Sequence, residues 1–199
     1  MNWSIDKSNI ALEGSVQDIA NKTGQTIEAV FANCKAAVLL DVSGSMRTYD
    51  VQSGNKEDNN FKMKTRFEAA SDALRDIQKL YQGYIAVISF SDNVKLCPSG
   101  IPVFEGSGTN LAAAMEYILP LDGSGMKFII ITDGHPDKPQ DCLDLKEKFS
   151  QPFEIIGIGD GADREFLSKL GNFTPISTAK EVMTLEGLSQ KLLAATVDN

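Results

Sequence analysis

One carboxylate and two hydroxyls lie close together in the stretch DVSGSM, residues 41–46. Asp41 ends an aliphatic run, and Ser43 and Ser45 alternate around Gly44, so a tight turn can point both hydroxyls to one side. Side chains of these types act either as nucleophiles beside a base or as oxygen ligands of a hard cation. Oxygen ligands suit Mg²⁺, Mn²⁺ or Ca²⁺ rather than Zn²⁺, which favours thiolate and imidazole.

Short, almost continuously apolar segments predict four strands that are covered on both faces. They are AAVLLDV (36–42), YIAVISFS (84–91), KFIIITDG (127–134) and FEIIGIGD (153–160). Between them, apolar residues repeat at three- and four-residue steps over 65–81, and shorter helical patterns cover 110–119, 141–149, 163–170 and 179–193. This alternation predicts an α/β fold with a doubly wound, mostly parallel central sheet and helices on both faces.

Two stretches depart from the alternation. The segment VKLCPSGIPVFE (94–105) has short extended pieces broken by Pro98 and Pro102. Proline cannot donate to a strand ladder, so we expect this segment at a sheet edge, as the one antiparallel strand. The stretch RTYDVQSGNKEDNN (47–60) lacks periodicity and is expected to be a long loop.

The strand pattern brings further oxygen ligands to the first three. In an open parallel sheet, ligands bind beyond the carboxyl ends of the strands. Asp133 follows the third predicted strand, and Thr109 stands on the glycine loop GSGTN that precedes a predicted helix. With Asp41, Ser43 and Ser45 they make two carboxylates and three hydroxyls, a set that suits a cation such as Mg²⁺ that keeps water or an open position.

Three separated elements, in this order, resemble the metal ion-dependent adhesion site (MIDAS) of von Willebrand factor A (vWA) domains. They are D-x-S-x-S at 41–45, a threonine after glycines in GSGTNL (106–111), and a strand ending in TDG (132–134). D-x-S-x-S alone is a weak signal, whereas three elements at predicted strand ends are a specific one. The resemblance covers residues 36 to about 195 and implies the Rossmann-like vWA fold with an intact MIDAS of the intracellular type.

The resemblance also implies a role for each site residue. Ser43 and Ser45 would ligate the metal directly, Thr109 directly or through water, and Asp41 and Asp133 would hold coordinated waters and the serine hydroxyls. In such domains the vacant position takes a carboxylate from a partner protein. The implied function is therefore a protein-binding module in which Mg²⁺, or Mn²⁺ or Ca²⁺, captures an Asp or Glu of a partner. The alternative is an accessory subunit of a metal- or AAA+ ATPase-dependent enzyme complex of the chelatase type.

The sequence favours a binding protein over an enzyme. A serine hydrolase needs a base, and the single histidine, His135, stands on a polar loop with no G-x-S-x-G motif in the chain. Phosphoryl transfer usually has a phosphate cradle, and GxxxxGK[ST] is absent. The glycines of GIGDG (157–161) do not make GxGxxG and are expected to end a buried strand in a turn.

Composition excludes several classes of protein. The 199 residues carry 19 Lys and Arg against 27 Asp and Glu, a net charge of −8, which argues against binding the nucleic-acid backbone. Three widely spaced cysteines without a CxxC motif predict reduced thiols rather than disulfides or a zinc site. The sequence shows neither a signal peptide nor an apolar stretch of membrane-spanning length, so we expect a cytoplasmic protein that does not contact the membrane.

The two ends of the chain carry further expectations. Residues 1–35 are predicted to be a helical appendage to a vWA domain over 36–199, with two short helices around Gly24. The alternative, a helix-turn-helix DNA reader, lacks an arginine in TIEAVFANC (26–34) and a clear third helix. At the other end, the resemblance implies that a ligand carboxylate shifts the last helix, here over 179–195.

Overall fold

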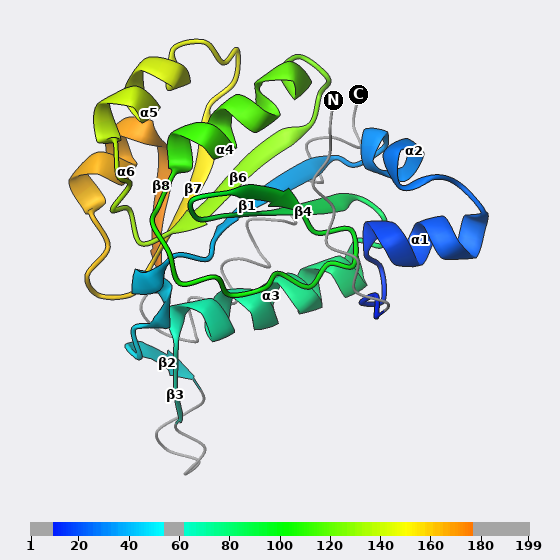
Figure 1. Ribbon diagram of the computed structural model, residues 1–199, viewed down its shortest axis with the longest axis horizontal. Coiled ribbons are helices and arrows are strands. Elements are labelled where there is room, and N and C mark those ends of the chain that lie inside the picture. The colour runs from blue at the N-terminus through cyan, green and yellow to red at the C-terminus, as the bar shows by residue number, and fades with distance from the viewer. Residues whose placement is uncertain (1–9, 54–61, 177–199) are drawn as a thin grey trace.

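The computed structural model describes residues 10–53 and 62–176. Helices and strands alternate along the chain (Figure 1). The helices are α1 (Val16–Thr23), α2 (Ile27–Ala32), α3 (Arg66–Leu80), α4 (Leu111–Ile118), α5 (Pro139–Lys146) and α6 (Arg164–Leu170), with 3-10 turns η1 (Gly44–Arg47) and η2 (Leu119–Leu121). The strands are β1 (Ala36–Asp41), β2 (Val51–Ser53), β3 (Lys62–Lys64), β4 (Ile85–Phe90), β5 (Val94–Leu96), β6 (Lys127–Thr132), β7 (Phe153–Ile158) and β8 (Gly171–Ile176).

The main sheet has six strands in the order β5-β4-β1-β6-β7-β8. Its neighbours pair in parallel except β5, which runs antiparallel to β4 at the edge of the sheet. The strand β1 is central, with Asp41 opposite Phe90 of β4 and Leu40 opposite Ile131 of β6. The doubly wound, mostly parallel sheet with one antiparallel edge strand is therefore confirmed.

Helices cover both faces of this sheet, α3 on one and α4, α5 and α6 on the other (Figure 1). Successive residues of β1 point to opposite faces, as the pleat of a strand requires. Leu39 belongs to the core cluster that includes Met115 of α4 and Leu167 of α6. Leu40 belongs to the cluster that includes Leu74 of α3. Burial on both faces explains why the central strands are almost continuously apolar.

The helix α3 matches the periodic segment predicted over 65–81, because both its packing and its start are encoded locally. Ala70, Leu74 and Ile77 form its buried stripe. Thr65 is the N-cap and accepts a hydrogen bond from the Glu68 N–H, while the Glu68 carboxylate accepts one from the Thr65 N–H. This reciprocal capping box satisfies backbone donors that the first turn leaves free.

Three strands were missed by the sequence prediction. The stretch 47–60 was expected to be a loop, but its residues 51–53 form β2, which pairs antiparallel with β3. Both strands are three residues long, too short for an alternation to be read. The strand β8 contains Pro175, which the missing N–H restricts to an edge, and β8 pairs only with β7 in the described part of the sheet.

Two short helices precede the first strand, as predicted. Ser15 caps α1 by accepting a hydrogen bond from the Asp18 N–H, and Gly24 ends it in the left-handed region at φ 71°. Val16 of α1 and Phe31 of α2 are buried in the same cluster that contains the α4 face of the sheet. The division of the chain at residue 35 stays a prediction, and the helix expected over 179–193, with its proposed movement, lies outside the described residues.

All three cysteines, Cys34, Cys97 and Cys142, are free and buried. Burial raises the pKa of the Cys34 and Cys142 thiols to about 12, so little reactive thiolate forms at pH 8. We expect Ellman's reagent to modify less than about a tenth of the thiols of the native protein within minutes, and all three in denaturant. A Ser168→Cys control on exposed helix surface should react at once. Rapid labelling of native wild-type protein would contradict the buried positions.

In the described ranges, no helix combines the length and the apolar character that crossing a membrane requires.

Candidate functional site

The carboxyl ends of β1 and β6 place Asp41 and Thr132 side by side. The two strands pair in parallel, and the Thr132 hydroxyl donates to Asp41 Oδ2 over 2.7 Å. The same hydroxyl oxygen accepts a hydrogen bond from the Gly134 N–H at 3.1 Å. This chain of hydrogen bonds ties the end of β1 to the turn that carries Asp133.

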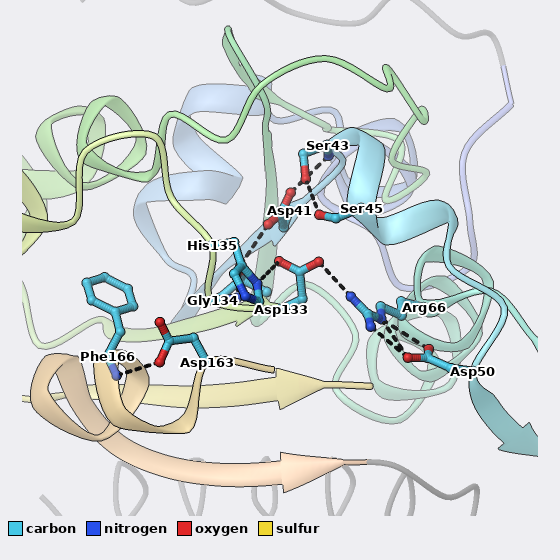
Figure 2. Close-up of polar contacts among 11 residues, drawn as sticks. Asp41, Ser43, Ser45, Asp50, Arg66, Asp133, Gly134, His135, Asp163 and Phe166 are labelled. Carbon is cyan, nitrogen blue, oxygen red and sulfur yellow. Dashed lines mark hydrogen bonds and ion pairs between the residues drawn. The ribbon is translucent and has the colours of Figure 1, made fainter. Parts of the chain in front are cut away.

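The turn after β1 gathers the first three predicted site residues (Figure 2). The Ser43 N–H donates to Asp41 Oδ1 at 2.9 Å, and the Ser43 and Ser45 hydroxyl oxygens lie 3.2 Å apart. Gly44 between them is exposed and Ser45 partly so, whereas Asp41 and Ser43 are buried. The turn therefore presents its two hydroxyls together, with the site open to solvent at Gly44 and Ser45.

Asp41 is fully buried, and this burial raises its pKa to about 6 despite hydrogen bonds from Ser43 and Thr132 that lower it. A carboxylate that is charged at neutral pH and removed from water is costly unless a cation or donors compensate it. Both Asp41 oxygens already accept hydrogen bonds, so Asp41 braces the turn and supplies charge.

The loop with Thr109 lies against this turn. The Gly44 N–H donates to the Ser107 carbonyl at 3.0 Å, and the Gly106 N–H donates to the Val42 carbonyl at 3.0 Å. Thr109 is buried, and its N–H donates to Asp137 Oδ2 at 3.0 Å. Within the described residues, Thr109 is joined to the other four site residues through loop backbone and not through a side-chain hydrogen bond.

Asp133 presents one oxygen with no donor. Its Oδ2 accepts a hydrogen bond from Arg66 Nη1 at 2.7 Å. Its Oδ1 is buried and has no hydrogen-bond partner among the described residues, with His135 Nδ1 at 3.5 Å. A buried carboxylate oxygen without a donor is rare, because such oxygens usually find a partner, water or a cation. This orphaned oxygen and the hydroxyl pair fit a hard cation.

Sequence reasoning missed Arg66 and Asp50 at this site (Figure 2). Arg66 is the first residue of α3, and its guanidinium bonds both Asp50 and Asp133. A cation in the first turn of a helix opposes the helix dipole. The unfavourable position of Arg66 was therefore a sign in the sequence that its side chain has a specific partner. Asp50 lies in the stretch that was predicted to be a loop, and nothing in its sequence context indicated a role at the site.

A second metal cluster or pocket among the described residues would be an alternative functional site. No group of three or more His, Cys, Asp and Glu side chains among these residues is arranged to hold a metal. A groove of about 530 Å³ lies elsewhere, between α3 and residues 100–102, and none of the five predicted site residues lines it.

No protein-family model and no curated protein matches the chain. Solved structures match it in fold. A von Willebrand factor type A structure from Catenulispora acidiphila aligns at TM-score 0.56 and 15% identity, over 79% of this chain and 42% of that one. The manganese-loaded TRAP protein of Plasmodium vivax aligns at TM-score 0.54 and 14% identity, over 77% and 72%. A mutant PilB minor pilin of Streptococcus sanguinis aligns at 0.53 and 13%, over 80% and 61%.

The chain has the von Willebrand factor A fold. It spans less than half the length of the first of these structures, and identities of 13–15% establish the fold alone. Within the vWA fold, the carboxyl end of the central sheet is where the residues of the candidate site meet. The function must be argued from those residues.

Proposed function

We propose that this vWA-fold chain is a divalent-cation-dependent protein-binding module. Asp41, Ser43, Ser45, Thr109 and Asp133 would hold Mg²⁺, or Mn²⁺ or Ca²⁺ in its place. When bound, the cation supplies positive charge and an exchangeable position for a carboxylate, here an Asp or Glu of a partner protein. The observation that carries the proposal is Asp133 Oδ1, a buried acceptor without a donor on the turn next to the paired serine hydroxyls.

The surroundings of the site support an acidic partner. Arg47 ends η1 two residues after Ser45, is exposed, and stacks over the Phe104 ring at 4.8 Å from its centroid. The ring quadrupole attracts the guanidinium and favours this position on the turn that carries Ser45. Arg47 adds a positive charge to the turn that carries Ser43 and Ser45, which favours an acidic partner. The manganese-loaded TRAP structure, which shares the fold, supports a cation of this class.

We propose binding without turnover. The Ser43 hydroxyl pairs with the Ser45 hydroxyl, and His135 lies beside Asp133, so no serine–histidine pair forms among the described residues. A nucleophilic serine needs a base within hydrogen-bond reach. Three free, buried cysteines are compatible with the reducing cytoplasm, where we place the protein.

Calorimetric titration with MgCl₂ and MnCl₂ tests the cation site. We expect Ser43→Ala to weaken binding at least about tenfold, because one of two paired hydroxyl ligands is lost. Ser168→Ala is the matched control, since that exposed hydroxyl donates to the Arg164 carbonyl of its own helix. Equal affinities for wild type and Ser43→Ala would refute the assigned site.

The partner is sought by pull-down from lysate in Mg²⁺ and in EDTA, with wild type and Ser43→Ala as bait. We expect a protein that wild type retains in Mg²⁺ and loses in EDTA, and that Ser43→Ala does not retain. Replacing acidic residues of that protein should then abolish retention. Capture of an AAA+ ATPase would support the chelatase-type alternative, and identical capture in Mg²⁺ and EDTA would contradict cation-dependent binding.

A further inference from the structure

A buried arginine lies between two aspartates at the candidate metal site (Figure 2). Arg66 donates from Nε and Nη2 to Asp50, with the shortest contact at 2.6 Å, and from Nη1 to Asp133 Oδ2 at 2.7 Å. Its side chain is only 8% exposed. Guanidinium is charged at every accessible pH, so a permanent positive charge is built in beside the candidate site.

The sheet provides a slot that fits this guanidinium. Gly159 follows β7 at φ +90°, and a Cβ there would lie 2.2 Å from Arg66 Nε. A Cβ on Gly161 would lie 3.2 Å from Arg66 Nη2. The glycines of GIGDG therefore do more than end a strand, because they leave room for a cation from α3. The slot after β7 is thus shaped to receive the Arg66 side chain, which reaches it from α3.

The position of Arg66 affects how Asp133 can meet a metal. The guanidinium bonds Oδ2, so Oδ1 of the same carboxylate is the oxygen left for a dication. A dication bound to Oδ1 would therefore share the Asp133 carboxylate with the positively charged Arg66 guanidinium. Charges within 4–6 Å shift the proton affinity of a group by roughly ten- to a thousandfold, and a doubly charged ion is affected at least as strongly. Asp50 offsets this repulsion by neutralising part of the guanidinium.

We propose that Arg66 is an internal cation that competes with the divalent metal for Asp133 and keeps the affinity of the site low. The inference rests on the metal site of the proposed function and deepens it. A metal bound beside Arg66 meets less negative charge from the protein, so its retention depends more on the carboxylate of a partner. Arg66 is thus a positioning residue that couples metal binding to partner binding.

Metal titrations of Arg66→Met and Asp50→Asn separate this role from a structural one. Arg66→Met removes the competing charge and should bind Mn²⁺ at least about tenfold more tightly than wild type. Asp50→Asn leaves the guanidinium uncompensated and should bind Mn²⁺ more weakly. Arg66→Lys keeps the charge but not the planar fork, so its Mn²⁺ affinity should lie closer to that of wild type than the affinity of Arg66→Met does. A bracing role alone predicts weaker binding in both Arg66→Met and Asp50→Asn.

The outcomes also separate this inference from the proposed function. If wild type binds Mn²⁺ and Arg66→Met binds it equally or less tightly, the inference is overturned while the metal site stands. If wild type alone does not bind Mn²⁺ but Arg66→Met does, the inference holds, and the pull-down in Mg²⁺ and in EDTA decides the proposed function: identical capture in both would overturn it. If neither binds, both are overturned. Thermal melts in EDTA and in MnCl₂ provide a second readout. In EDTA, Arg66→Met should have a lower melting temperature than wild type, and MnCl₂ should raise its melting temperature by more than it raises that of wild type.

Discussion

An Asp41→Asn chain is expected to lose divalent-cation affinity by about a hundredfold or more while keeping its fold. At an effective dielectric constant of about 20, removing a negative charge about 8–10 Å from a dication costs about 3–4 kcal/mol, and removing a closer one costs more. The fold should survive because asparagine keeps an oxygen for the Ser43 N–H. Its amide can donate to the Thr132 hydroxyl, which is free to act as donor or acceptor.

Calorimetry with MnCl₂ measures the loss of affinity, and urea unfolding in EDTA measures stability. We expect the free energies of unfolding of wild type and Asp41→Asn to agree within about 1–2 kcal/mol at pH 7. Unchanged affinity would show that Asp41 does not serve the cation. A variant that fails to fold would show that Asp41 is needed to build the turn rather than to bind metal.

The pH dependence of the free energy of unfolding in EDTA tests the raised pKa of Asp41, because that pKa fixes whether stability falls or rises with pH. Burial raises the pKa of Asp41 to about 6 in the native state, against about 3.9 in an unfolded chain. The native state therefore binds this proton more tightly, so the stability it contributes is complete below about pH 4 and is lost as the pH rises through about 6. Asp41→Asn lacks this contribution, so wild type should lose stability relative to the variant between pH 4 and 6. A difference that is flat with pH would contradict the raised pKa.

The central part of the fold could be predicted because its signals are local. The strands β1, β4, β6 and β7 are apolar on both faces, and α3 carries both its stripe and its capping box within its own sequence. The strands β2 and β3 could not be predicted, since three residues are too few to show a period. The strand β8 was hidden by Pro175, which is tolerated only because β8 lies at the edge of the described sheet.

The candidate site was predictable where it depends on strand ends. Asp41, Ser43 and Ser45 share one turn, and Asp133 follows the adjacent parallel strand, so topology alone brings the two strand ends together. Arg66 was missed because it reaches the site from another element, through a slot that exists only in the folded sheet. Sequence patterns describe which face a residue takes on its own element. They do not describe which long side chain enters a space left by distant glycines.

A Gly159→Ala chain is expected to be the least stable of the variants considered, with a free energy of unfolding at least about 4 kcal/mol below that of wild type. The left-handed backbone at φ +90° costs a residue with a Cβ about 1–2 kcal/mol. The new methyl also lies 2.2 Å from Arg66 Nε and 2.9 Å from Asp50 Oδ2, so the guanidinium must leave the slot. Breaking a buried ion pair costs about 3–5 kcal/mol, because a charge is left buried without its partner.

Gly123→Ala is the matched control. Gly123 has φ +81°, and nothing lies within 4 Å of a Cβ built there, so this change measures backbone strain without a clash. The excess loss in Gly159→Ala is then the cost of displacing Arg66. In an Arg66→Ala background the guanidinium is gone, and the Asp50 carboxylate that it held is free to turn away from the new methyl. Gly159→Ala should then cost about as much as Gly123→Ala. Urea unfolding of wild type, the two single variants and the double variant measures this coupling directly. If Gly159→Ala lowers the free energy of unfolding equally with and without Arg66, the glycine is needed only for the left-handed backbone of the turn. A slot that accommodates the guanidinium should tolerate the extra methyl once the guanidinium is gone.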